Sequence, residues 1–236
     1  MNRNARVAGV LFLVSTGAYM LGSWLLNPML QGPEFLAGLF ADRTRAAAGL
    51  LLELINAIAV MGIAMLLYPV LQKYNGAFAA GYLSSRIIES VLLIISLIAP
   101  ILLISLSEDH ATAEASGYSY LQRIADVAVE AHLMLFQLAM IVLSLGSLLL
   151  CYVLYRSELI PRWLSVIGFI GYAGLLTSSS LAICGRDTGT ILYIPGAIFE
   201  IVLPLWLLVK GFNLREETSS LARGPDHGAA NALDRE

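Results

Sequence analysis

The sequence predicts an all-α membrane protein, a bundle of six transmembrane helices with a short interfacial helix on the outer side. Of its 236 residues, 58% are hydrophobic and only 13% are charged, which is far from the balance of a soluble domain. Six uninterrupted apolar runs are long enough to cross a hydrocarbon core about 30 Å thick, which requires roughly 20 helical residues. Lipid offers the backbone no hydrogen bonds, so runs of this length are helices and not the shorter, alternating strands of a barrel. The runs comprise residues 7–30, 46–71, 77–106, 133–155, 163–184 and 191–209.

The segment between the first two runs predicts the interfacial helix, at residues 33–41. Pro33 suits the first turn of a helix because its missing N–H would have no partner there. Four apolar side chains then fall on one face of this helix: Phe35, Leu36, Leu39 and Phe40. One apolar face on a short helix is typical of a segment that lies on a membrane surface.

Short connections predict antiparallel hairpins between the second and third runs and between the fourth and fifth. The first of these turns is at residues 73–76, and the second is at residues 156–162. After an acidic loop at residues 107–120, the next helix can extend over residues 121–155, which is about 52 Å at 1.5 Å per residue. This is longer than the membrane is thick, so the helix must protrude on the outer side or bend near residues 130–132.

The fifth run carries a stripe of small residues that predicts close helix packing. They recur at intervals of three: Ser165, Gly168, Gly171 and Gly174. Small side chains let the backbones of two membrane helices approach each other closely, so we expect this stripe to be a packing surface.

The distribution of Lys and Arg predicts that both termini are cytoplasmic. Nine basic residues lie on the side of the N-terminus and four on the other side, and basic loops remain in the cytoplasm. We expect residues 1–212 to form the six-span domain and the polar residues 213–236 to form a disordered cytoplasmic tail. The nine are Arg3, Arg6, Lys73, Arg156, Arg162, Lys210, Arg215, Arg223 and Arg235, and the four are Arg43, Arg45, Arg123 and Arg186.

Four ionisable residues lie inside the apolar runs, where an ionised side chain costs about 2.5–3.5 kcal/mol on insertion scales. They are Glu53, Arg86, Glu89 and Glu200. Helical spacing puts Tyr82 on the face of Arg86 and Glu89, and Asn56 on the face of Glu53, so we expect these polar stripes to face one another and the stripe of Glu200. Three acids and one base leave two negative charges uncompensated, so at least one glutamate must be protonated or neutralised by a cation or a cationic ligand group. The predicted ligand-binding residues are Glu53, Asn56, Tyr82, Arg86, Glu89 and Glu200.

Three functions fit this pattern, and the sequence favours the first. It is the binding or translocation of a small or lipid-like ligand, or of protons, at the buried charged site. The second is an intramembrane metal-dependent lipid hydrolase in which His132 acts with Asp126, Glu130 or a facing glutamate. The third is a structural or assembly protein in which Arg86 bridges two glutamates and holds the helices in register.

The sequence also limits the partners. The three histidines form no HExxH pattern and no nucleotide-binding loop is present, so we expect no metal and no cofactor. The expected partner is membrane lipid and not nucleic acid, with a small-molecule or lipid ligand and a homo-oligomer left open.

Several short segments along residues 6–212 resemble a known family. They are RVAG at 6–9, ELINA at 53–57, YPVL at 68–71, RIIE at 86–89, LIPRWL at 159–164, FE at 199–200, LWL at 205–207 and KGF at 210–212. Together they resemble the bacterial six-span membrane family called domain of unknown function 4386. The resemblance implies a multi-pass protein of the bacterial inner membrane and brings no known activity. The segments include Glu53, Asn56, Arg86, Glu89 and Glu200, which the cost of burying charge also singles out.

Overall fold

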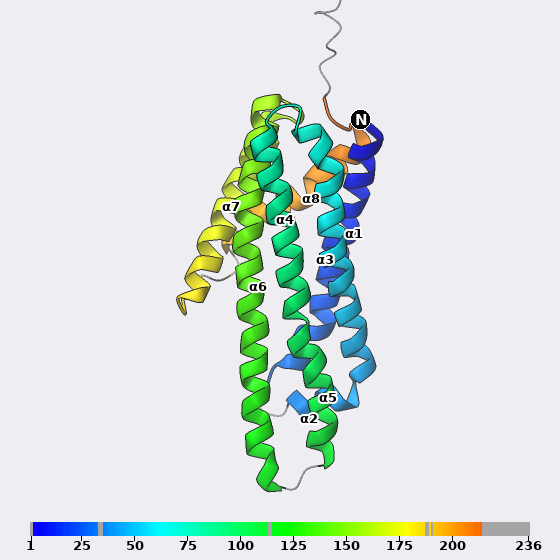
Figure 1. The fold of residues 1–236 in the computed structure, drawn as a ribbon, viewed down its shortest axis with the longest axis vertical. Helices are drawn as coiled ribbons and strands as arrows, with labels where there is room; N and C mark the ends of the chain where they lie inside the picture. The colour runs from blue at the N-terminus through cyan, green and yellow to red at the C-terminus, as the bar shows by residue number, and fades with distance from the viewer. Residues whose placement is uncertain (1, 33–34, 113–114, 187–188, 190, 214–236) are drawn as a thin grey trace, which may run out of the picture.

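The computed structural model describes residues 2–32, 35–112, 115–186, 189 and 191–213, and within these ranges the regular elements are all helices. Six helical stretches are long and apolar enough to span a membrane, and they coincide with the six predicted runs. The predicted fold class, an all-α membrane bundle, is confirmed. In chain order the elements are α1 (Asn2–Leu26), the 3-10 helix η1 (Asn27–Leu30), α2 (Phe35–Ala41), α3 (Arg43–Leu71), α4 (Gly76–Ser96), α5 (Ile98–Thr112), α6 (Ala115–Ser157), α7 (Arg162–Ile183), the 3-10 helix η2 (Ile191–Tyr193) and α8 (Ile194–Val209) (Figure 1).

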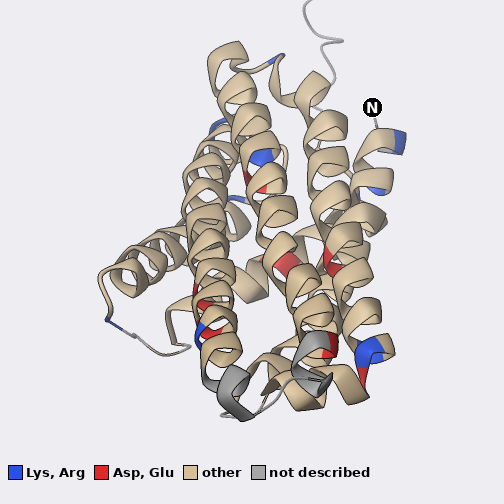
Figure 2. Ribbon diagram, turned by 60° about the horizontal axis from the view of Figure 1, so that its bottom comes forward, with Lys and Arg blue, Asp and Glu red and all other residues tan. Residues whose placement is uncertain are grey.

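The six spanning segments are neighbours in chain order, and the last packs against the first. Helix α1 packs along α3, α3 along α4, α4 along α6, α6 along α7, and α7 along α8, which returns to α1. The start of α1, the α3–α4 and α6–α7 turns and the end of α8 therefore lie at one end of the bundle (Figure 1). Charged residues are sparse along most of the helix surface, as expected of a surface that faces lipid (Figure 2).

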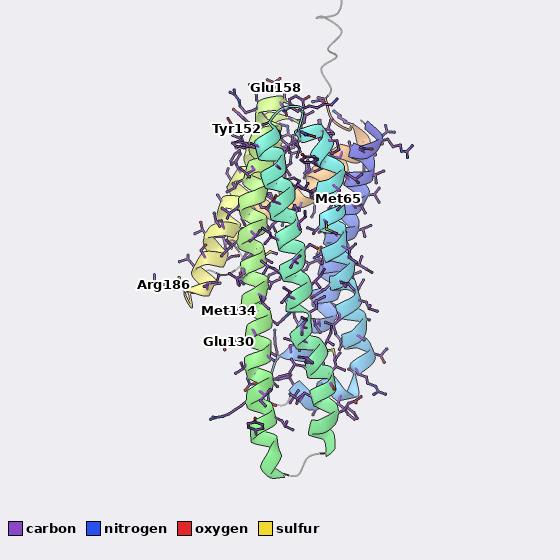
Figure 3. All side chains as sticks on the ribbon, in the orientation of Figure 1. Met65, Glu130, Met134, Tyr152, Glu158 and Arg186 are labelled. Carbon is purple, nitrogen blue, oxygen red and sulfur yellow. The ribbon has the colours of Figure 1, made fainter. Side chains whose placement is uncertain are left out.

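Helix α6 protrudes and does not bend. It is a single helix of 43 residues, about 65 Å long at 1.5 Å per residue, and it extends well past the end of α7. Figure 3 places Arg186, just beyond α7, near the level of Met134 on α6, and Glu130 lies beyond that level. The part of α6 before its apolar run therefore extends past the shorter helices, and α5 runs beside it.

The third span is broken into α4 and α5 at Leu97. Pro100 has no N–H and cannot donate to the carbonyl of Ser96 four residues earlier, which interrupts the helical hydrogen bonds at this point. The helix ends in a tighter turn here, in which the N–H of Leu97 donates to the carbonyl of Ile94, three residues earlier, at 3.2 Å. The break divides the span Gly76–Glu108 into two helices, and the second of these, α5, runs beside α6.

The predicted interfacial helix exists as α2, and most of its apolar face packs against protein. Phe35, Leu36 and Leu39 are buried in a small core that α2 shares with η1, α3, α5 and α6. Phe40 is 42% exposed and faces outward. Pro33, the predicted first residue, lies outside the described residues.

The chain after α8 returns to the α6–α7 turn. The N–H of Asn213 donates to the carbonyl of Leu159 at 2.9 Å, and Phe212 is buried. Apart from Asn213, the predicted disordered tail at residues 213–236 lies outside the described residues.

Candidate functional site

The centre of the candidate site is an ion pair within α4. A guanidinium nitrogen of Arg86 donates to a carboxylate oxygen of Glu89 at 2.7 Å, and the two residues are only 3% and 2% exposed. Their spacing of three residues puts both on the buried face of α4, as the sequence predicted. The Tyr82 ring lies one turn earlier, with its centroid 5.6 Å from the guanidinium carbon, and its hydroxyl accepts from Arg86 Nε at 3.4 Å. Opposite charge and an aromatic face thus stabilise the arginine in an environment without water.

Glu200 approaches this ion pair from α8. The hydroxyl of Tyr172, on α7, donates to Glu200 Oε1 at 3.3 Å, a long hydrogen bond. The backbones of α7 and α8 meet at Gly171 and Gly196, where a Cβ added to Gly171 would lie only 2.5 Å from the Gly196 Cα. The small-residue stripe of the fifth run is therefore a packing surface, as predicted, and it brings Tyr172 and Glu200 together.

Glu200 interacts with Arg86 without forming an ion pair with it. The Glu200 carboxylate is within electrostatic reach of Arg86 and of Glu89. Among the described residues, however, no basic side chain lies within 4.0 Å of Glu200, and Arg86 pairs with Glu89 alone. The bridge from Arg86 to two glutamates, which the structural alternative supposed, is therefore not formed among the described residues. Among the described residues, the guanidinium of Arg86 forms a direct ion pair with one acid, Glu89.

Glu53 and Asn56 face α1, and their side-chain bonds are with its serines. Ser15 Oγ donates to Asn56 Oδ1 at 2.6 Å, and Ser23 Oγ donates to Glu53 Oε1 at 3.4 Å. The close approach of α1 and α3 at Gly22 explains this arrangement, because a Cβ on Gly22 would lie 3.0 Å from Glu53 Cγ. The predicted residues thus form two groups, one around Arg86 and one beside α1.

A small cavity adjoins the second group. It offers about 10 Å³ for the centre of a water molecule, which is about the minimum that holds one water. Its lining includes an acid, an amide and a phenol group, which are polar partners that a water can bond. The lining residues are Tyr19, Glu53, Asn56, Leu93, Leu97 and Phe136.

Two tyrosines of the site were missed from the sequence. Tyr172 donates to Glu200, and Tyr19 lines the cavity with Glu53. The acid that each tyrosine approaches is on another helix. Helical spacing within the tyrosine's own helix therefore gave no sign of the contact. The only available signal was a tyrosine well inside an apolar run, which is also common in helix packing.

His132, the metal ligand of the alternative hydrolase function, instead hydrogen-bonds the backbone. Its Nδ1 lies 2.8 Å from the carbonyl oxygen of Ser96, and the residue is 5% exposed. This is the carbonyl that Pro100 leaves without a helical donor, so His132 donates its Nδ1–H to complete the hydrogen bonding at the α4–α5 break. Within the described part of the chain, no three His, Cys, Asp or Glu side chains group as metal ligands. The geometry gives His132 a structural role.

The comparison with known families matches most of the chain. The family described as Domain of unknown function (DUF4386) matches residues 7–211, a range that contains the six predicted apolar runs and every site residue discussed above. No curated protein and no solved structure matches the chain. The protein is a multi-pass membrane protein by its six apolar helices, and its chain belongs to the DUF4386 family.

Proposed function

We propose that this protein takes up and releases protons within the membrane, at the carboxyl groups of Glu53 and Glu200. The observation that carries the proposal is the division of charge at the site. Arg86, the single base inside the apolar runs, is paired at 2.7 Å with Glu89. Within the part of the chain that the structure describes, Glu53 and Glu200 then have only long bonds from hydroxyl groups, at 3.4 and 3.3 Å. A carboxyl group at membrane depth with no basic partner is neutralised most readily by a proton.

The size of the cavity favours protons over a larger ligand at this site. Sites for drug-sized ligands enclose about 300–1,000 Å³, whereas the cavity beside Glu53 accommodates about one water. A proton needs only that water and the hydroxyl groups already present. Leu93, Leu97 and Phe136 supply the apolar part of the lining.

The purely architectural alternative loses its main support. It required Arg86 to bridge glutamates on different helices and so hold them in register. Arg86 and Glu89 are both on α4, so their ion pair links no two helices. A buried pair inside one helix costs desolvation without adding tertiary contacts, which favours a function for it.

We further propose that the protein resides in a bacterial inner membrane with both termini in the cytoplasm. The excess of basic residues, nine against four, supports this orientation. The start of α1 and the end of α8 lie at the same end of the bundle, as an even number of spans requires (Figure 1). Protons would then reach Glu53 from the outer half and leave past Glu200, or the reverse.

The test is a pair of measurements on purified protein. Infrared spectra should contain carbonyl bands of protonated carboxylic acids that disappear separately in Glu53→Gln and Glu200→Gln. Proteoliposomes with a trapped pH dye should take up protons under an imposed membrane potential, and each substitution should abolish the uptake. The matched control is Glu158→Gln, an exposed acid in the α6–α7 turn, which should change neither signal. Wild-type protein with neither the bands nor the uptake would overturn the proposal.

A further inference from the structure

The exposed face of α6 carries a continuous apolar stripe. Its residues are spaced at alternating intervals of four and three, which is the heptad spacing of a coiled coil. Most members of the stripe are exposed and none is buried, whereas Ala125, Ala139 and Leu150 are buried on the other side of the same helix. We call this stripe the α6 seam. It begins with Tyr120, Ile124, Val127, Ala131, Met134 and Leu138, and the same intervals continue to Tyr155.

Lipid accounts for only part of the α6 seam. From Tyr155 back to Tyr120 the seam is about 52 Å long at 1.5 Å per residue, whereas the hydrocarbon core is about 30 Å thick. Arg123 and Glu130 are exposed beside its first residues, and ionised side chains are costly inside the hydrocarbon. The α6 seam therefore continues beyond the lipid, where Tyr120 is 69% exposed and Val127 is 66% exposed. A row of apolar side chains on a surface that faces water indicates a protein contact.

We propose that the α6 seam is the interface of a homodimer, in which two copies of α6 form a parallel, left-handed coiled coil about a two-fold axis along the membrane normal. The membrane gives both copies the same direction and the same depth, so each residue of the seam meets its own counterpart. Every residue of the seam is apolar, so this contact brings no like charges together. A second copy of the chain therefore matches this surface chemically along its whole length.

The α6 seam is large enough for a stable dimer. A strip about 52 Å long and about 10 Å wide, the diameter of a helix, covers about 500 Å² on each copy. The two copies together then bury about 1,000 Å², which reaches the lower limit for a biological interface. Side chains that pack as knobs into holes bury more accessible surface than a flat strip. The small side chain of Ala131 also lets the two helices approach closely at that level.

Disulfide cross-linking in native membranes tests the interface. In a Cys184→Ser background, which leaves only the buried Cys151, Val127→Cys introduces a thiol at the α6 seam. Its counterpart lies directly across the two-fold axis, so mild oxidation should convert most of the protein to a covalent dimer that a reductant reverses. The matched control is Asp126→Cys, which is exposed at the same level but about 100° around the helix and should remain monomeric. Equal cross-linking of the two variants would overturn the proposed interface.

A second measurement follows the association itself and does not depend on the proposed proton sites. Single-molecule photobleaching of labelled protein in liposomes should show dimers that dissociate as the ratio of lipid to protein is raised. Val127→Lys should increase the dissociation constant at least about 10-fold, because like charges then meet across the axis. Asp126→Lys should leave it nearly unchanged, and both positions are exposed, so neither substitution disturbs the packed bundle. Wild-type protein that is monomeric at every ratio would overturn the dimer, and lipid or a different protein would then cover the α6 seam.

Discussion

Arg86 and Glu89 show how a charged pair is tolerated inside a membrane helix. Each charge alone would cost several kcal/mol to desolvate, and the cost falls when the two are in direct contact. The spacing of three residues allows that contact at 2.7 Å on one helix, and the Tyr82 ring covers the guanidinium. The pair is neutral as a whole, and among the described residues neither Glu53 nor Glu200 has a basic side chain in direct contact.

Removing one partner of the pair should be far more costly than removing both. We expect Arg86→Leu to destabilise the folded protein by about 3–5 kcal/mol, because Glu89 becomes a buried acid with no partner. The double variant Arg86→Leu with Glu89→Gln should recover part of this loss. Unfolding in a denaturing-detergent titration measures both.

The exposed pair of Arg162 and Glu158 provides the control. Its side chains are 63% and 44% exposed, so Arg162→Leu should cost about 1 kcal/mol or less. Equal midpoints for wild type and Arg86→Leu would contradict a stabilising buried pair.

At the residue scale, the sequence predicted contacts within a helix and missed those between helices. The bond of Arg86 to Glu89 follows from their spacing alone. The approach of Tyr172 to Glu200 and of Tyr19 to Glu53 depends on how each helix is rotated against its neighbours. The periodicity of a single helix carries no information about that rotation. The polar residues that were predicted to form one cluster therefore lie in two groups, one around Arg86 and one beside α1.

At the scale of elements, the break between α4 and α5 shows a proline compensated from another helix. Pro100 removes the donor for the Ser96 carbonyl, and His132 on α6 supplies one at 2.8 Å. An unsatisfied carbonyl in an apolar environment costs about 1–3 kcal/mol, so the histidine stabilises the break and also ties α6 to it. The sequence showed both Pro100 and His132, but only the packing of α6 along α4 makes them partners.

This coupling can be measured with a double-mutant cycle. His132→Leu, of similar size but without a donor, should cost about 1–3 kcal/mol in the natural background because the Ser96 carbonyl loses its partner. In a Pro100→Ala background, the new N–H of residue 100 can donate to that carbonyl, so the same substitution should cost less. The loss of packing is common to both backgrounds and cancels. Equal costs in the two backgrounds would show that His132 does not serve the carbonyl freed by Pro100.

At the scale of the whole molecule, hydropathy predicted the number and extent of the spans because each segment that crosses lipid must be a long, apolar helix. The short connections likewise predicted the two antiparallel hairpins. The closing contact of α8 with α1 was not predicted, because nothing in either helix alone specifies its non-sequential neighbour. That contact places α8, with Glu200, on one side of α1, while α3, with Glu53, packs on another.

The orientation of the whole bundle is testable with the cysteines that the chain already contains. Cys184 follows α7 at the predicted outer end and is exposed, whereas Cys151 is buried in the bundle. A membrane-impermeant maleimide added to intact cells should therefore label wild-type protein at Cys184, and Cys184→Ser should abolish the labelling. A cysteine introduced as Tyr74→Cys in the Cys184→Ser background lies in the α3–α4 turn, at the opposite end of the bundle. It should react only after the membrane is permeabilised. Labelling of Tyr74→Cys but not of Cys184 in intact cells would reverse the topology, and the side with nine basic residues would then lie outside, against the tendency of basic loops to remain in the cytoplasm.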